Sequence, residues 1–244
     1  MKFVLLSFFI AYFSVSTGFP SETKFHIVLD PGHGGPDLGA TRNSFIESKI
    51  VFQIARKVKA QLDRQKNITA TLTRNETQGL SLKDRVLLAH ELKADLFVSL
   101  HANTSNWASI SGVEFYFNSN GPSRSEFKEP TASENHHLSK VEVIEKIKND
   151  FLFYDKTERS LLLAQSFKSV QEQSPTLKTK QKITIRRAPF YVLDQTSMPS
   201  ALIELGFISN LREAKKLSSE EYQNELAQRL ATALLEYKEK SDKL

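Results

Sequence analysis

Four polar side chains in this sequence are of the types that bind or assist a catalytic metal ion: His33, Glu47, His101 and Glu204. His33 lies in the glycine-rich segment DPGHGG directly after an apolar run, and His101 ends the run LFVSLH. Two imidazoles and one carboxylate are the ligand set of a catalytic zinc ion, which keeps a fourth position for water. A second carboxylate nearby then serves as general base, and Glu204, flanked by apolar residues in SALIELGF, is the candidate.

Three of these residues have an alternative structural role. Glu47 lies three residues after Ser44, a spacing that suits a capping box at the start of a helix. His101 by itself could be a hydrogen-bonded histidine in a strand, and Glu204 by itself could pair with a buried arginine. Only the joint position of the four residues favours a metal site.

The periodicity of apolar residues predicts the elements that position these side chains. Strands are expected at 25–30, 68–74, 94–101 and 112–117, with two closing strands in 188–207, and helices at 44–65, 81–94, 138–154, 157–171 and 220–238. Because strands alternate with helices, the predicted class is α/β, with a central, mostly parallel twisted sheet flanked by helices and a helical insertion before the last strands. The carboxyl ends of parallel strands share one edge, where the four polar side chains are expected to meet.

Length and composition bound the remaining possibilities. At 244 residues the chain suffices for one domain with a full apolar core, which we expect over residues 19–244. Residues 1–18 carry an early lysine, an apolar run and small residues, a layout typical of a secretory signal peptide, with an uncleaved anchor as the alternative. The absence of cysteine excludes a disulfide framework. The net charge of +5 comes from scattered residues, so no nucleic-acid partner is expected.

The motifs, taken in order, resemble those of the zinc-dependent N-acetylmuramoyl-L-alanine amidases, which cut stem peptides from the glycan strands of cell walls. The similarity spans nearly all of residues 25–235 and is carried by IVLDPGHGGPDLGA, TLTR, SLKDRVLLAH, FVSLHANTS and FYVLDQTSMPSALIELGFISN. By this resemblance His33, Glu47 and His101 take the ligand positions of one Zn²⁺ per chain, and Glu204 is the catalytic glutamate. The implied reaction is hydrolysis of the amide between N-acetylmuramic acid and L-alanine of peptidoglycan, by an exported protein that is periplasmic or associated with the cell wall.

Three further residues are weaker candidates for substrate binding. Asn103 belongs to the SLHAN match and could hold a ligand or substrate through its side-chain amide. Arg74 and Arg187 could pair with stem-peptide carboxylates, because guanidinium groups suit carboxylates. A surface or structural salt bridge is the alternative for both arginines.

Residues 118–184 occupy the place where some relatives carry an inserted helix that covers the cleft until an activator moves it. We therefore predict a regulatory insertion in which the helix around 138–154 lies over the zinc ion, with Glu142 or Glu145 in the open coordination position. The apolar side of this helix would dock on the body or on an activator protein. A surface hairpin without a function is the alternative.

Two other classes of protein are compatible with the same scaffold. One is a non-catalytic protein that binds or regulates the cell wall, and the intact set of four polar residues argues against it. The other is a zinc carboxypeptidase acting on wall peptides, which fold and ligands alone do not exclude. Only the extended resemblance to the amidases argues against this second class.

Overall fold

The computed structural model describes residues 24–42, 44–118, 139–173 and 182–243, so the predicted signal peptide, residues 1–18, lies outside the described residues. The strands are β1 (Phe25–Pro31), β2 (Thr41–Arg42), β3 (Phe45–Ile46), β4 (Ile68–Leu72), β5 (Leu96–Asn103), β6 (Val113–Phe117), β7 (Ile183–Arg187) and β8 (Ser200–Phe207). The helices are α1 (Glu47–Leu62), α2 (Leu82–Glu91), α3 (Lys140–Gln173), α4 (Tyr191–Gln195), α5 (Leu211–Leu217) and α6 (Glu220–Ser241).

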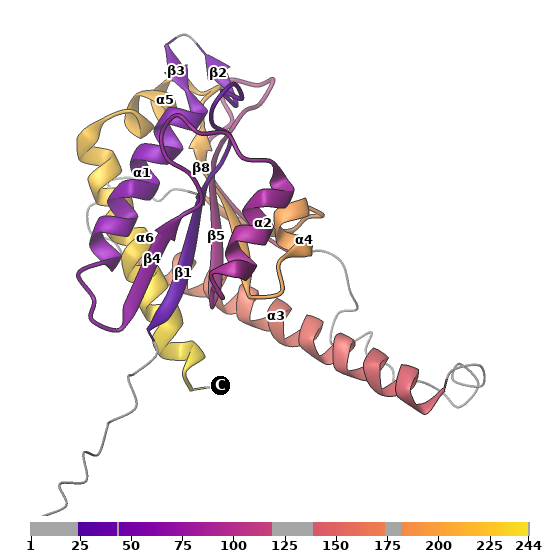
Figure 1. Ribbon diagram of the computed structural model, residues 1–244. Coiled ribbons are helices and arrows are strands. Elements are labelled where there is room, and N and C mark those ends of the chain that lie inside the picture. The colour runs from indigo at the N-terminus through magenta and orange to yellow at the C-terminus, as the bar shows by residue number, and fades with distance from the viewer. Residues whose placement is uncertain (1–23, 43, 119–138, 174–181, 244) are drawn as a thin grey trace, which may run out of the picture.

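A six-stranded sheet in the order β4-β1-β5-β8-β6-β7 forms the centre of the molecule, with helices on both faces (Figure 1). The strands β4, β1, β5 and β8 are parallel, whereas β6 is antiparallel to β8 and parallel to β7. The predicted α/β class with a mostly parallel sheet is therefore confirmed. We call the edge where β1, β5 and β8 end the carboxyl edge; β6 ends at the opposite edge.

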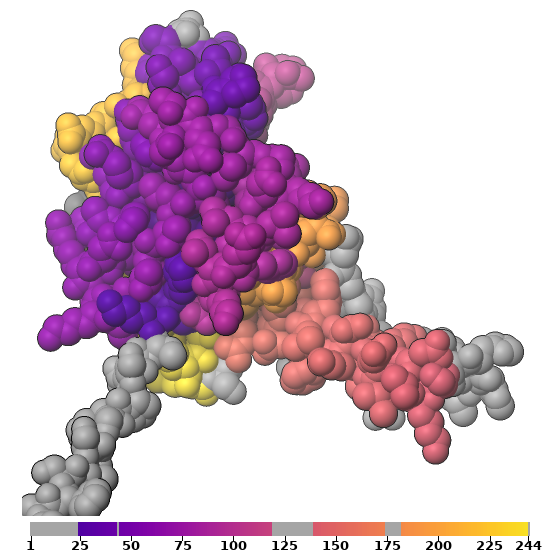
Figure 2. Space-filling view, viewed as in Figure 1, coloured from indigo at the N-terminus to yellow at the C-terminus, as the bar shows by residue number. Residues whose placement is uncertain are grey.

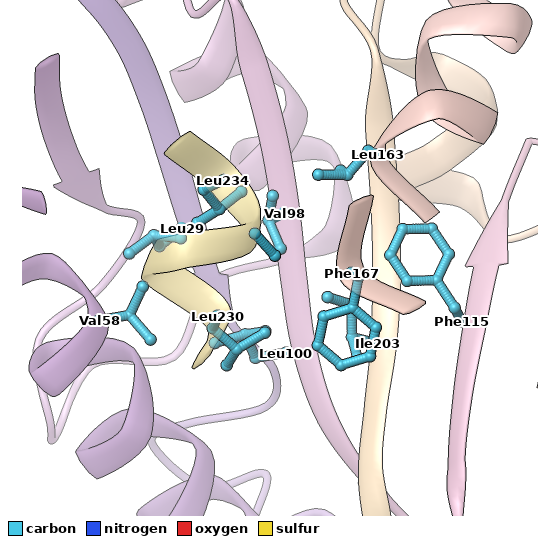
Figure 3. A pocket seen from close by; sticks show the side chains of 11 residues that line it. Leu29, Val58, Val98, Leu100, Phe115, Leu163, Phe167, Ile203, Leu230 and Leu234 are labelled. Atoms are coloured by element: carbon cyan, nitrogen blue, oxygen red, sulfur yellow. The ribbon is translucent and has the colours of Figure 1, made fainter. Parts of the chain in front are cut away.

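Alternating apolar residues of the sheet supply two cores. Ile27 and Leu29 face the larger core, which α1, α6 and the second half of α3 cover, and Val28 faces the smaller core under α2 and α4. Each fully buried aliphatic side chain contributes roughly 1.5–3 kcal/mol to folding. The larger core contains a small void of about 10 Å³. Apolar side chains from the sheet, α1, α3 and α6 line it (Figure 3). The sheet is thereby packed on both faces, and its carboxyl edge stays open for a site.

The helix α3 is one continuous helix of 34 residues, where the sequence predicted two. Its first half, residues 140–155, contains no buried residue and projects from the body (Figure 2); we call it the arm. From Lys156 onward α3 packs against the body. The buried Lys156 amine donates hydrogen bonds to the carbonyls of Leu193 and Thr196. No helix within the described ranges, α3 included, has an apolar stretch that could cross a membrane.

One of the two predicted closing strands is wrong. Residues 191–195 form the short helix α4, and only β8 is a strand within 188–207. The strand next to β6 is instead β7, which precedes this segment. The predicted carboxyl-terminal helix is confirmed as α6. Ser81 caps α2 by accepting a hydrogen bond from Asp84 N.

Candidate metal centre

His33, Glu47 and His101 lie together at the carboxyl edge of the sheet. His33 follows β1, Glu47 is the first residue of α1, and His101 lies near the end of β5. Each side chain offers one ligand atom, and the three atoms all lie within 4.8 Å of one another. Among the described residues, this is the one cluster of such side chains that could hold a metal ion.

Glu47 links the two histidines. Its Oε1 lies 3.2 Å from His33 Nε2 and 3.0 Å from His101 Nδ1. Two ligands at tetrahedral positions about 2.0–2.1 Å from a zinc ion lie roughly 3.3 Å apart, so both spacings suit zinc ligands. The carboxylate also accepts hydrogen bonds from the backbone N–H groups of Ala40 and Ala102. Because α1 begins without a side-chain cap, the alternative capping role of Glu47 is wrong.

The charges of this cluster stabilise one another. Burial would raise the pKa of Glu47, but hydrogen bonds and charge interactions with His101 and His33 hold that pKa well below its usual value. Burial would lower the pKa of His33, but contacts with Glu47 and Asp37 raise it to about 9. Glu47 is therefore ionised at neutral pH, as a carboxylate ligand must be.

The glycines of the loop between β1 and α1 allow this close approach. A Cβ atom on Gly32 would lie 2.2 Å from the His101 ring, and one on Gly39 would lie 2.6 Å from Glu47 Oε2. His33 itself has a φ of 58°, in the left-handed region that is uncommon for residues other than glycine. Its Nδ1 is 2.8 Å from Asp37 Oδ2, a contact that orients the ring with Nε2 toward Glu47.

A buried ion pair holds the loop beneath His33. Arg85 Nη1 donates to Asp30 Oδ1 at 2.6 Å and to the carbonyl of Pro31, and Arg85 Nη2 donates to the carbonyl of His33. Both members of the pair are almost fully buried. Since one rigid guanidinium group ties the carbonyl of His33 to the end of β1, the backbone that carries His33 has little freedom to move.

The position of Arg74 does not suit the predicted contact with substrate. It is 3% exposed, and its guanidinium group donates to the carbonyls of Pro31, Gly32 and Ser48. The backbone carbonyls thus take the donors that a substrate carboxylate would need. The placement makes Arg74 a second support for the His33 loop.

Glu204 lies beside His101, because the two residues are partners in the register of β5 and β8. Its Oε2 is buried, and no donor within the described residues reaches it, so it does not pair with a buried arginine. Burial and then the negative charges of Glu47 and Glu114 raise the pKa of Glu204 to about 8. A buried oxygen without a donor next to a two-histidine, one-carboxylate cluster fits a site for a divalent cation and water.

A cleft of about 450 Å³ opens at this cluster on the face of the sheet that carries α2 and α4. Its volume is in the range of pockets that hold small molecules or short segments of a polymer. The lining brings together His33, His101, Glu204, Leu82, Phe190 and Tyr191. The two candidate histidine ligands and Glu204 therefore face a space that a substrate can enter.

The other residues predicted to bind substrate lie at two different places. Asn103 Nδ2 donates to Glu114 Oε2 at 2.7 Å, and Glu114 is the partner of Glu204 in the register of β6 and β8. Arg187 lies at the end of β7, with its guanidinium carbon 5.4 Å from the centre of the Phe117 ring. Because side chains alternate along a strand, Phe117 and Glu114 point to opposite faces of the sheet. Asn103 is thus near Glu204, whereas Arg187 is on the other face.

Glu142 and Glu145 are not brought to the cluster. Both are exposed on the arm, and Glu142 Oε2 accepts a hydrogen bond from Ser139 N. The chain leaves β6 at the edge opposite to the carboxyl edge, because β6 runs antiparallel to β8, and the arm lies on that side of the molecule (Figure 1). Figure 1 shows the arm extending away from the end of β8.

Three residues of the site were missed by reasoning from the sequence: Asp37, Arg85 and Glu114. Asp37 follows His33 by four residues, a signal that a carboxylate could orient the imidazole. Glu114 alternates with apolar residues in GVEFYF, which places it on one face of the strand. Arg85 lies in a helical segment that carries no comparable local signal, because its partner Asp30 is distant in sequence.

Known proteins are similar to this chain in sequence and in fold. Residues 27–236 match the family described as N-acetylmuramoyl-L-alanine amidase. The chain is 33% identical over 227 residues to the N-acetylmuramoyl-L-alanine amidase AmiA of Escherichia coli K12, with 89% of this chain and 77% of AmiA covered. It is 31% identical over 218 residues to AmiC of Escherichia coli O6:H1, with 86% of this chain covered but 52% of AmiC. The chain thus spans about half the length of that relative.

A solved structure shows the same fold. The N-acetylmuramoyl-L-alanine amidase AmiC2 of Nostoc punctiforme superimposes with a TM-score of 0.66 at 28% sequence identity. The match covers 90% of this chain and 99% of that chain.

Proposed function

Since the chain belongs to the N-acetylmuramoyl-L-alanine amidase family, we propose that it is a zinc hydrolase that cleaves the amide between N-acetylmuramic acid and L-alanine in peptidoglycan. The observation that carries the proposal is the cluster of two histidines and one glutamate next to the buried carboxyl of Glu204. His33, Glu47 and His101 would hold one zinc ion, with a position left for catalysis.

The chain's own residues supply the remaining chemistry. A bound zinc ion contributes Lewis acidity, which polarises a carbonyl and lowers the pKa of water to about 7. Glu204 Oε2 accepts a proton from the attacking water and delivers it to the amine that leaves with L-alanine. Burial raises the pKa of Glu204, which favours the protonated carboxyl that forms between the two transfers. Asp37 and Arg85 keep His33 in position during both proton transfers.

The reaction is tested on purified sacculi, with and without a chelator, by identifying the released fragments by mass. We expect free stem peptides with L-alanine at the amino terminus, and loss of release with the chelator that zinc restores. Release of single carboxyl-terminal residues would instead indicate a carboxypeptidase. No release from any wall substrate by the zinc-loaded protein would favour a wall-binding protein.

The role of Glu204 is tested by Glu204→Gln. We expect this variant to keep zinc and to lose turnover by about 100-fold to 10,000-fold, the range for removing a general acid–base group. His33→Ala and His101→Ala should lower the zinc content as well. Glu91→Gln is the matched control, because Glu91 is an exposed glutamate at the far end of α2. Turnover at the wild-type rate by Glu204→Gln would contradict the assigned role.

Export of the protein to the periplasm or cell wall is part of the proposal. Residues 1–18 support it through their early lysine, apolar run and small residues. The test is to locate the protein by cell fractionation and to sequence its amino terminus. Cleavage near Gly18 is expected, and a protein that stays in the cytoplasm with Met1 intact would contradict the expectation.

The arm supports a proposal about a protein partner. Four apolar side chains of the arm are 45–65% exposed and recur at helical spacing: Val141, Ile144, Ile147 and Phe151. Amphipathic helices commonly place such a row in an apolar groove of another protein. We therefore propose that an activator protein docks on the arm.

Autoinhibition is the alternative role of the arm, and it requires Glu142 or Glu145 to reach the carboxyl edge. Excision of residues 141–154 separates the two roles. Inhibition predicts that basal activity rises in the shortened, folded protein. Docking predicts unchanged basal activity and loss of stimulation by the partner.

A further inference from the structure

A polar surface continues from Glu204 across the next two strands of the sheet. Glu204 on β8 pairs with Glu114 on β6, and Glu114 pairs with Thr184 on β7. Directly paired residues point to the same face of a sheet, so these three side chains lie in one row. The row lies on the same face of the sheet as the cleft. It begins at Glu204, where the cleft ends, and continues onto β6 and β7.

Arg186 belongs to this surface, and its neighbour Arg187 does not. Arg186 is two residues after Thr184 on β7, so alternation along the strand places both on the same face. The ion pair of Arg186 Nη2 with Glu114 Oε1, at 3.8 Å, agrees with this placement. Arg187 instead lies over Phe117 on the other face.

The guanidinium group of Arg186 is held near Glu114 and is still accessible. Glu114 Oε2 accepts hydrogen bonds from Asn103 Nδ2 at 2.7 Å and from the Tyr116 hydroxyl at 2.9 Å. These two donors fix the carboxylate, whereas the ion pair with Arg186 is long and the arginine side chain is 59% exposed. An exposed pair of this kind contributes little by itself, so a stronger anionic partner can take the remaining donors.

Aromatic side chains connect this surface to the cleft. Phe190 lines the cleft, and its ring packs edge-on against that of Tyr116, with centroids 5.2 Å apart. Tyr116 in turn donates to Glu114. A peptide that leaves the cleft past Glu204 therefore passes Phe190 and Tyr116 and reaches Arg186.

The spacing suits the first residues of a stem peptide. Neighbouring strands lie about 4.8 Å apart and Arg186 is two residues along β7 from Thr184, so the backbones at Glu204 and Arg186 are roughly 12 Å apart. An extended peptide spans about 3.3–3.6 Å per residue, so this distance corresponds to about three residues. The carboxylate of Glu114 would repel an anionic peptide on this path, and Arg186 is the cation that offsets it.

We propose that Arg186 binds a carboxylate of the stem peptide within three residues of the scissile amide, and thereby selects substrates with a free carboxylate there. The inference rests on the proposed amidase function and extends it to substrate specificity. Asn103, Glu114 and Tyr116 position the guanidinium group, and Phe190 guides the peptide from the cleft.

The test compares Arg186→Ala with Arg187→Ala, its neighbour on the opposite face. The substrates are a muramoyl tripeptide with free carboxylates and the same tripeptide with all its carboxylates as carboxamides. We expect Arg186→Ala to lower kcat/KM about tenfold on the free acid, mainly through KM, and less than twofold on the carboxamide. Arg187→Ala should match the wild type on both, and Arg186→Lys should recover part of the loss. Equal losses on both substrates, or equal effects of both alanine variants, would overturn the proposal.

Binding of the free tripeptide, measured by calorimetry, gives a readout that needs no turnover. We expect Arg186→Ala to weaken binding about tenfold and Arg187→Ala to leave it unchanged. A wild-type protein that binds the tripeptide through Arg186 but cleaves no muramoyl peptide would refute the amidase function and keep the subsite. Cleavage with peptide binding that is independent of Arg186 would refute the subsite alone.

Discussion

The carboxyl edge of the sheet and the arm of α3 hold their side chains in opposite ways. At the edge, polar groups are buried and fixed: Glu47 contacts both histidines, and Arg85 holds the loop of His33 from below. In the arm, apolar groups such as Ile144 are 64% exposed. The comparison indicates that the edge is organised in advance for chemistry, whereas the arm is suited to contact with another surface.

The largest effect is expected from disturbing the edge with Gly32→Ala. The added Cβ would lie 2.2 Å from the His101 ring, so the ring must move. A displacement of about 1 Å at a catalytic group costs roughly 100-fold in rate. We expect activity on sacculi to fall by at least about that factor, with less than one zinc ion per chain by atomic absorption. Lys146→Ala in the arm should change neither value, and wild-type activity of Gly32→Ala would show that the edge tolerates movement.

A second contrast compares two arginine–aspartate pairs. Arg85→Met leaves Asp30, which is 1% exposed, as an unpaired buried charge, and should lower the free energy of unfolding by about 3–5 kcal/mol. Arg159→Met removes the partly exposed pair with Asp155 on α3 and a hydrogen bond to the Ser241 hydroxyl, and should cost only about 1–2 kcal/mol. Urea unfolding measures both. Equal losses in the free energy of unfolding for the two variants would contradict the claim that the carboxyl edge is held more firmly than α3.

Lys156, where the arm joins the body, provides a prediction for the pH dependence of the free energy of unfolding. Burial lowers the pKa of Lys156 from 10.5 to about 8, against a smaller opposing effect of Asp194. Between these two pH values the unfolded chain binds more protons than the folded one, so the free energy of unfolding gains a contribution that rises with pH. Lys156→Met should remove this rise, which amounts to at most roughly 3 kcal/mol. Lys146→Met, in the exposed arm, should follow the wild type, whereas parallel curves for wild type and Lys156→Met would refute the assignment.

The smallest effect is expected within the arm itself. Ile144→Ser should change the free energy of unfolding by less than about 0.5 kcal/mol, because the side chain is already exposed. Leu163→Ala, on the same helix but 1% exposed, should cost about 2–5 kcal/mol. Denaturant titration of both variants tests the contrast. A loss above about 1 kcal/mol for Ile144→Ser would mean that the arm packs against the body in solution.

The cluster at the edge could be predicted from the sequence because its residues follow a simple rule. His33 and His101 each come at the end of a strand, and parallel strands end at the same edge whatever their order in the sheet. Glu47 begins the helix that follows the first of these strands. The roles of Asp37 and Arg85 needed the path of the loop in space, which depends on contacts between residues distant in sequence.

The arrangement of the insertion could not be predicted in the same way. An apolar run of four residues, Phe190 to Leu193, does not distinguish a strand from a short helix, so the sequence predicts a strand where α4 forms. The polar segment around Lys156 and Thr157 was interpreted as a break, but both side chains are buried, and the Thr157 hydroxyl donates to the Phe153 carbonyl within one continuous helix. The direction of β6 has no local signal, and it decides at which edge the chain leaves the sheet before the insertion.

The reversed direction of β6 has a consequence for how such a protein can diversify. Any stretch inserted after Phe117 emerges on the side remote from the histidines. Changes confined to the exposed arm are therefore expected to leave the reaction centre in place, whereas changes to α3 from Lys156 onward would disturb the larger core.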